Sequence, residues 1–404
     1  MKDTIYDAII IGAGPAGASL AYFLSDANLK IALIEKKKYA DRPVRCAELV
    51  PRALTMLYSD KIKGINNEVS HMETYIEGKL ANITGSRGYI LDRNIFIDFL
   101  IKEFVKKGGD YLSSAGFINA YHPGLEENSC GCQPVEESAA NESHISHNFD
   151  NSRMLYVEIR QNDSTFCLKT KILAGADGPC SQVAKIMKPL PRNEYKFQEN
   201  HDIKSSFLIG FQENITKKKD YENHTKIYFY PFISGGYGWV FPKKESLNVG
   251  MAVNINALKE NGLKNTYQRF KRELVKNEVI KGDEYINSTI SGLAPVCGIK
   301  SRVVQNNIIL IGDSAGLCNP ITGAGNYNAA ASAKIAAAKI KTAITTDNME
   351  ILNEAQKDIC DYFKTSIGHA LKKRQFLEKN KSDYDFGNLI KKTWVSFKDY
   401  WRER

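Results

Sequence analysis

The sequence predicts an α/β protein with two lobes, one built around a parallel sheet flanked by helices and the other around a mainly antiparallel sheet. The length of 404 residues exceeds the size at which one hydrophobic core usually stops growing. Near the amino terminus, a β-branched run, a glycine-rich turn and an alanine-rich helix follow one another, as in a βαβ unit. The hydrophobic fraction of 43% and the charged fraction of 25% are those of an ordinary globular chain.

The first glycine-rich turn is predicted to bind a dinucleotide. A strand, the turn G-A-G-P-A-G and a helix occupy residues 6–27. The three glycines permit, in order, the tight turn, the approach of the backbone to a pyrophosphate, and close packing of helix on strand. The amino end of the helix adds partial positive charge for the phosphates. The turn residues predicted to contact the dinucleotide are Gly12, Gly14, Ala16 and Gly17.

An acidic residue ends the next predicted strand, over residues 30–35. Glu35 lies 18 residues after Gly17, close to the position at which a carboxylate meets the ribose hydroxyls of a bound dinucleotide. A carboxylate there disfavours a 2′-phosphate. The adenosine is therefore expected to be unphosphorylated.

A second glycine-rich segment lies far along the chain and bears on which dinucleotide binds. A strand predicted over 307–311 ends in Gly312-Asp313 and is followed by a turn and an alanine-rich helix over 329–343. A carboxylate at the tip of a strand can accept a hydrogen bond from a ribityl hydroxyl, and the turn offers backbone donors to a flavin ring. The turn residues predicted to contact the flavin are Gly323, Ala324 and Gly325.

These residues resemble the second FAD motif of para-hydroxybenzoate-hydroxylase-type flavoproteins, in which the aspartate contacts the ribityl chain. Arg93 resembles that family's helix-opening arginine, which reaches the cofactor, and Asp177 resembles its Asp-Gly strand end. Taken alone, Arg93 would be a solvated arginine at a helix start and Asp177 a turn former. The matches run in order over residues 6–344. The resemblance implies a Rossmann-type FAD-binding lobe like that of para-hydroxybenzoate hydroxylase.

Three further segments resemble the geranylgeranyl reductase family: the loop R-C-A-E at 45–48, the run Y-G-W-V-F-P-K at 237–243, and residues 292–298. That family carries a Cys-Gly-Glu-like loop near the flavin and a Y-x-W-x-F-P-K element beside a lipid tunnel. The resemblance implies an FAD-dependent oxidoreductase that reduces carbon–carbon double bonds of a polyprenyl lipid by hydride transfer. It also places three loop residues beside the flavin: Arg45, Cys46 and Ala47. Four residues depart from the family's usual ones and leave the exact substrate open: Ala47, Leu49, Asn326 and Ala333.

The aromatic residues Tyr237, Trp239 and Phe241 alternate along a predicted strand, so their rings share one face. Such a face can wall an apolar channel for an isoprenoid or another long hydrocarbon. It can equally be the core of the second lobe. We predict these three residues as substrate contacts.

Two residues are candidate proton donors to the substrate, Cys46 and Tyr237, and the flavin itself is a third source. A thiol over the flavin could supply a proton or act as a redox partner, and the charge of Arg45 would stabilise its thiolate. The alternative is a structural loop cysteine. Residue types alone do not decide among these sources.

Other flavoprotein activities stay open at this level. A monooxygenase or halogenase would use the same cofactor lobe with dioxygen, and the Trp239 element is similar to the halogenase W-x-W-x-I-P box. A quinone-linked electron-transfer flavoprotein dehydrogenase is disfavoured, because the eight cysteines include no closely spaced set of four. No second strand–G-x-G-x-x-G–helix unit occurs, so NAD(P)H would bind transiently, or a ferredoxin or flavodoxin would deliver the electrons.

Four segments make up the predicted domain organisation. Residues 1–185 and 291–345 form the FAD-binding lobe, 186–290 form the substrate lobe, and 346–404 form a basic helical region. A polar insertion over 121–152 contains six acids and neither lysine nor arginine. Four of its side chains could bind a soft metal or, through the cysteines, form a redox disulfide, although an acidic surface loop explains the composition as well: Cys130, Cys132, His144 and His147.

The net charge of +9 is spread among acids without a nucleic-acid-binding motif, so nucleic acid is excluded as a partner. Residues 361–404 hold 11 Lys/Arg against 6 Asp/Glu, together with Trp394, Phe397, Tyr400 and Trp401. This region could contact an anionic membrane face or could simply be a solvated helix with packing aromatics. No apolar run of eighteen residues and no secretory signal occurs, which favours a cytoplasmic protein, with peripheral membrane contact as the alternative.

Overall fold

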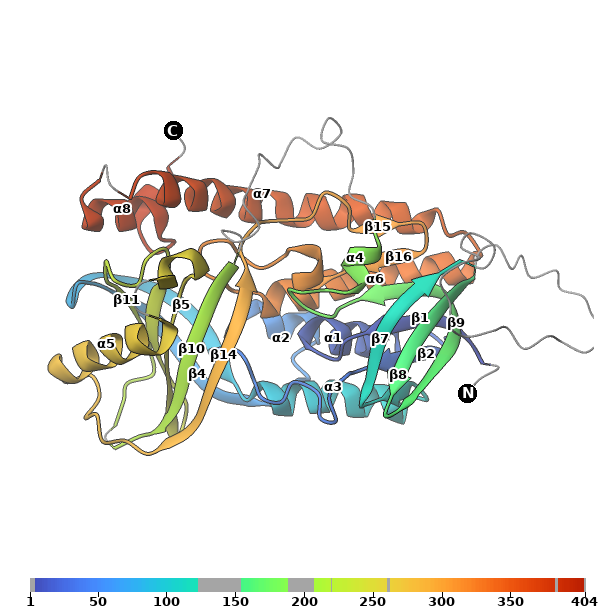
Figure 1. The fold of residues 1–404 in the computed structure, drawn as a ribbon, viewed down its shortest axis with the longest axis horizontal. Coiled ribbons are helices and arrows are strands. Elements are labelled where there is room, and N and C mark those ends of the chain that lie inside the picture. Colours follow the sequence, from blue (N-terminus) through green and yellow to red (C-terminus); the bar gives the residue numbers. More distant parts are fainter. Residues whose placement is uncertain are drawn as a thin grey trace, which may run out of the picture.

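The computed structural model describes residues 4–122, 154–187, 207–218, 220–259, 262–381 and 384–402. Two mixed sheets lie side by side, with helices on both, and the long helix α7 runs along one side of the two lobes (Figure 1). The predicted α/β class is confirmed. The predicted metal or disulfide residues of the insertion lie outside the described residues: Cys130, Cys132, His144 and His147.

The first sheet is the Rossmann-type sheet, with the strand order β15-β16-β9-β1-β2-β6. From β16 to β6 its neighbours pair in parallel, because each strand returns through a helix or a long crossover. A β7–β8 hairpin adds antiparallel strands to β9. Its strands are β1 (Ile5–Ile11), β2 (Ile31–Ile34), β6 (Asp110–Leu112), β7 (Ala115–Tyr121), β8 (Leu155–Gln161), β9 (Ser164–Gly175), β15 (Val304–Gln305) and β16 (Ile308–Leu310).

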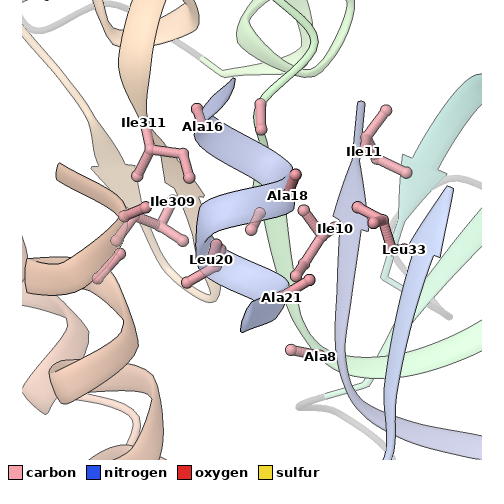
Figure 2. Packing of buried hydrophobic residues seen from close by; sticks show 14 of the residues in the cluster. Ala8, Ile10, Ile11, Ala16, Ala18, Leu20, Ala21, Leu33, Ile309 and Ile311 are labelled. Atoms are coloured by element: carbon pink, nitrogen blue, oxygen red, sulfur yellow. The ribbon is translucent and has the colours of Figure 1, made fainter. Parts of the chain in front are cut away.

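Helix α1 (Pro15–Leu24) packs between this sheet and α6 (Asn326–Thr345). Figure 2 shows its small residues against Ile10 on one side and Ile309 on the other. Gly312 has φ of 61°, and a Cβ there would lie 2.8 Å from the Cβ of Ala16. The two glycine-rich motifs, distant in sequence, are therefore in direct contact, and only glycine fits at that point.

The second sheet has the strand order β14-β10-β13-β12-β11-β4-β5-β3. Its pairings are antiparallel except for that of β11 with β4, which is parallel. Helix α5 (Leu263–Lys276) packs on one face of it. Its strands are β3 (Leu49–Pro51), β4 (Ile65–Ile76), β5 (Lys79–Leu91), β10 (Phe207–Thr216), β11 (Thr225–Phe229), β12 (Tyr237–Pro242), β13 (Ser246–Asn254) and β14 (Ile286–Pro295).

Strands β3, β4 and β5 belong to the second sheet, although they lie within the segment 1–185 that we predicted as FAD-binding lobe. The chain leaves the first sheet after β2, forms these three strands, and returns through α3 (Arg93–Lys106) to β6. Each lobe is thus assembled from alternating stretches of sequence, and a single cut near residue 185 does not separate them.

The carboxyl-terminal region is helical, as predicted, and consists mainly of α7 (Ile351–Lys379) and α8 (Phe386–Thr393). Three of the four aromatics proposed for membrane contact are instead packed against the second sheet, with exposures of 3% for Trp394, 9% for Phe397 and 2% for Tyr400. Among the helices that the structure describes, none is long and apolar enough to cross a membrane. The short elements are α2 (Ala53–Leu57), α4 (Val183–Ile186), η4 (Ile255–Lys259), η5 (Gly312–Ala315) and η6 (Lys398–Tyr400).

Candidate active site

The turn between β1 and α1 has the shape of a phosphate-binding loop. Gly12 has φ of 96°, and a Cβ there would lie 2.5 Å from the carbonyl oxygen of Ala176. A Cβ on Gly17 would overlap the carbonyl oxygen of Gly12. By contrast, a Cβ on Gly14 would meet nothing within 4 Å, so the space before the helix amino end is open. The loop therefore fits a pyrophosphate.

Glu35 stabilises this turn through hydrogen bonds to its side-chain carboxylate. Its side chain is 7% exposed, and one carboxylate oxygen accepts a hydrogen bond from the Ala13 amide at 2.9 Å. The other oxygen accepts from the Lys37 amide at 2.9 Å. Each oxygen keeps a second lone pair, so the ribose contact predicted for Glu35 is compatible with these bonds and stays a prediction.

Asp313 is a half-buried acceptor without a hydrogen-bond donor among the described residues. Burial raises the pKa of Asp313 to about 6, and the nearby Arg93 charge opposes this rise. A Cβ on Gly325 would lie 2.9 Å from the Asp313 carboxylate. An unpartnered carboxylate beside a glycine fits a ribityl hydroxyl donor.

The backbone amides of two other turn residues, Gly323 and Ala324, already donate hydrogen bonds within their own loop. The Gly323 amide donates to the carbonyl of Asn319 at 2.9 Å, and the Ala324 amide donates to the Thr322 hydroxyl at 3.3 Å. Their roles as donors to the flavin remain predictions, and Gly325 is the residue of this turn that needs to be small.

Arg93 is buried rather than solvated. Its Nε and Nη2 each donate to the Asp41 carboxylate at 2.6 Å, and its Nη1 donates to the Asn326 side-chain oxygen at 3.3 Å. Burial alone would lower the pKa of Arg93, but the Asp41 carboxylate outweighs this effect and raises it. Arg93 thereby joins the loop after β2 to the start of α6, and a cofactor contact remains a prediction. Sequence reasoning missed Asp41, whose signal was a lone acid in a basic loop.

Asp177 makes the contacts of a helix cap. Its carboxylate accepts hydrogen bonds from the Ser181 hydroxyl at 2.5 Å, the Gln182 amide at 2.6 Å and the Val183 amide at 3.2 Å. These bonds satisfy free donors at the start of α4. The backbone of Asp177 also packs against Gly12. Its predicted cofactor contact stays a prediction.

The Cys46 thiol is held between two donors. Its sulfur accepts from the Glu48 amide at 3.2 Å and from the Asn326 side-chain nitrogen at 3.4 Å. The Cys46 carbonyl accepts from Gln212 at 3.4 Å, and Gln212 in turn accepts from the Trp239 indole at 3.1 Å. The thiol loop, the second FAD motif and the aromatic strand therefore meet at one point.

Glu48 anchors that loop from the other side. It is 4% exposed, and its carboxylate accepts from the Arg93 amide at 2.8 Å and from Asn248 at 3.1 Å. Lys243 forms an ion pair with it at 2.5 Å. Arg45 is exposed and its Cβ faces Gly292, whereas Ala47 packs at the edge of the aromatic cluster.

The aromatic wall is mostly buried. Trp239 is 7% and Phe241 is 3% exposed, and the half-buried Tyr237 hydroxyl donates to the Thr322 carbonyl. Burial raises the pKa of Tyr237, with smaller contributions from Cys318 and Cys46. The ring of Trp394, which sequence reasoning missed as a site residue, lies 4.8 Å from that of Tyr237.

A family model described as an FAD binding domain matches residues 5–361. The chain belongs to this FAD-binding family. The predicted cofactor and the prediction of an FAD-dependent oxidoreductase are thereby confirmed. A digeranylgeranylglycerophospholipid reductase of Methanocaldococcus jannaschii is 26% identical over 391 residues, which span 94% of this chain and 88% of that protein.

Among solved structures, a geranylgeranyl bacteriochlorophyll reductase-like protein of Thermoplasma acidophilum has a TM-score of 0.76 at 22% identity. The match covers 98% of this chain and 92% of that one. The myxobacterial chondrochloren halogenase matches less well, with a TM-score of 0.64, 16% identity, and coverage of 90% and 81%. These relatives support the resemblance to the geranylgeranyl reductase family that the motifs indicated.

Proposed function

We propose that this flavoprotein reduces carbon–carbon double bonds of a polyprenyl, geranylgeranyl-type lipid. The observation that carries the proposal is the position of Cys46, whose backbone carbonyl is joined to the aromatic wall through Gln212 and whose thiol is joined to the second FAD motif through Asn326. An apolar wall suits a hydrocarbon chain, and a thiol is a proton donor. The curated relatives are named as reductases of a digeranylgeranyl lipid, which supports the same substrate class.

The reduction of an isolated alkene depends on a proton donor, because such an alkene accepts hydride poorly unless it is protonated at the same time. FAD, when bound and reduced, supplies the hydride, and a proton must be delivered to the neighbouring carbon. Both donors to the Cys46 sulfur become stronger partners once the proton leaves, so they stabilise the thiolate product. Tyr237 is the weaker acid, since its hydroxyl already donates to Thr322 and its pKa is raised. We therefore assign Cys46 as the donor.

Water exclusion would come from the buried wall. Trp239 and Phe241 pack in a cluster that Trp394 and Phe397 cover from the carboxyl-terminal region. A cation developing on the substrate would be protected there from attack by water.

The proposal is tested by anaerobic single-turnover experiments with the purified yellow protein. Reduced protein mixed with a geranylgeranyl lipid should be reoxidised, and mass analysis should show a gain of two hydrogens per double bond. NAD(P)H, ferredoxin and flavodoxin, tried in turn as reductants, would identify the external electron donor. Absence of reoxidation by every polyprenyl lipid, together with oxygen transfer to an aromatic or halide acceptor in air, would establish the monooxygenase or halogenase alternative.

Replacing Trp239 by phenylalanine should weaken lipid affinity by about 1 kcal/mol, because the smaller ring loses aromatic contact while keeping the core filled. The dependence of the reoxidation rate on lipid concentration measures this. Trp401→Phe is the matched control, since Trp401 is 65% exposed and lies outside the wall. Equal affinities in both variants would show that the wall is core only.

Peripheral membrane contact remains a separate proposal. It now depends on Trp401 and its basic neighbours Lys398 and Arg402, because the other three aromatics of the region are packed inside. Flotation of the protein with anionic vesicles, compared with Trp401→Ala, tests it.

A further inference from the structure

Two neighbouring strands of the second sheet bring two histidines and a glutamate together, away from the thiol site. Side chains alternate along β4, so His71 and Glu73 share one face. The parallel pairing of β11 with β4 sets Lys226 beside Glu73 and brings His224, just before β11, beside His71. The two imidazole rings stack with centroids 4.5 Å apart and planes 16° apart.

This face of the sheet is the one that α5 covers. Tyr75 and Tyr228, the next residues on the same face, pack with the cluster around α5. Met72 and Phe229 point the other way and pack with the aromatic wall. The histidine pair therefore lies on the opposite face of the sheet from the wall.

The three side chains can each offer one ligand atom, and these atoms all lie within 4.8 Å of one another. His224 is 4% exposed, and neither of its ring nitrogens has an aligned hydrogen-bond partner. Its Nε2 nevertheless lies 3.1 Å from a carboxylate oxygen of Glu73. A close but misaligned nitrogen–oxygen contact is poor for a hydrogen bond.

The same geometry suits two ligands of one metal ion. Two atoms bound to tetrahedral zinc at about 2.0–2.2 Å lie about 3.4 Å apart, each with its lone pair aimed at the metal and not at the other atom. The separation of 3.1 Å between His224 and Glu73, without an aligned hydrogen bond, is close to this distance. We propose that His71, Glu73 and His224 form a zinc site that fastens β4 to β11.

Neighbouring groups fit the outer sphere of such a site. The Ser70 hydroxyl lies 2.9 Å from His71 Nδ1, which leaves Nε2 free for the metal. The Tyr75 hydroxyl donates to Glu73 at 2.6 Å. A carboxylate oxygen of the exposed Glu222 side chain lies 3.2 Å from His224 Nδ1, close enough to become its partner after a small rotation, although the contact is not aligned as a hydrogen bond. Metal-binding histidines are commonly oriented by a carboxylate or another polar group on the second nitrogen. Two imidazoles and a carboxylate are a ligand set that zinc accepts, with water in the fourth position.

Lys226 would compete with a metal ion for the Glu73 carboxylate. Its ammonium nitrogen lies 3.6 Å from the Glu73 carboxylate, and its side chain is 27% exposed, so it can swing into solvent when zinc binds. Removing its charge should therefore strengthen zinc binding. If these side chains only stabilised the pairing of β4 with β11 and bound no metal, the same change would instead weaken that pairing.

The test uses the full-length, FAD-loaded protein after chelator treatment and dialysis, titrated with zinc chloride in a calorimeter. One zinc ion per chain should bind, and the thermal midpoint should rise with zinc concentration. His71→Ala and His224→Gln should each lower affinity by about 10–100-fold or more, given that even outer-sphere losses have that effect. Lys226→Gln should raise affinity.

Controls separate this site from the insertion, whose cysteines are a second potential zinc site. The double variant Cys130→Ser/Cys132→Ser should bind zinc like the wild type, and flavin absorbance should show that every variant retains FAD. Zinc binding that is absent in the wild type, unchanged in both histidine variants, or lost in the cysteine variant would overturn the proposal. Unchanged or weaker binding in Lys226→Gln would overturn it even where a histidine variant fails to fold.

Discussion

Cys46→Ser should lower the single-turnover rate of lipid reduction by about 100-fold or more while FAD content stays unchanged. The hydroxyl of serine is a far weaker acid than a thiol, and losing a positioned proton donor typically costs a factor in this range. The two donors to the sulfur, from Glu48 and Asn326, would remain in place. Rapid mixing of the reduced variant with lipid under strict anaerobiosis measures the effect.

Three comparison variants make this result specific. Tyr237→Phe should slow the reaction only a few-fold, because that hydroxyl is engaged with Thr322. Asn326→Leu removes one of two hydrogen bonds to the thiol and should cost up to about tenfold. Cys167→Ser, in strand β9, should have no effect. If Tyr237→Phe abolishes turnover and Cys46→Ser does not, the tyrosine is the proton donor.

Asp313→Ala should weaken FAD binding by about 10–150-fold, because a hydrogen bond from a ribityl hydroxyl to a charged acceptor is worth about 1.5–3 kcal/mol. No group in the described part of the chain donates to this carboxylate, so its lone pairs are left for the ribityl hydroxyl. Dilution of the yellow protein followed by release of flavin fluorescence measures the dissociation constant. Asp163→Ala, on the exposed β8–β9 turn, is the control.

The raised pKa of Asp313, about 6, adds a pH dependence to this prediction. As the pH falls through that value, the carboxyl takes up a proton and loses its charge, so FAD should be released more readily. As the pH rises above it, the charged acceptor is restored and binding should be tighter. Asp313→Asn should remove this step. A wild-type affinity that is flat between pH 5 and 7, measured by the same dilution, would contradict the role of Asp313.

The glycine motifs could be predicted from sequence because steric demands are local. Gly12 has a positive φ that the turn itself requires, a Cβ on Gly17 would meet the nearby carbonyl of Gly12, and Gly312 completes a strand–turn pattern of its own. The alternation of Tyr237, Trp239 and Phe241 likewise needs no knowledge of the rest of the chain, and the observed strand β12 confirms it.

Long-range pairing could not be predicted in the same way. Nothing in residues 65–76 shows that β4 pairs with β11. The hydrogen bonds between strands are made by backbone groups, which are the same in every residue type except proline. Asn326 was noticed as a departure from the geranylgeranyl reductase pattern, but its bond to Cys46 depends on two segments meeting in space. The same holds for Trp394, whose aromatic character fits a membrane contact and a packed core equally well.

The contact between Gly312 and Ala16 can form only late in synthesis, because the two residues lie far apart in the sequence. A ribosome adding about 5–20 residues per second delivers the second partner about 15–60 s after the first. Until then the nascent chain carries α1 without the α6 and β16 surfaces that cover it, although small residues such as Ala18 and Ala21 limit the apolar area left exposed. The FAD site is complete only once translation has passed residue 325. A chain truncated before that point should therefore bind no flavin and be colourless.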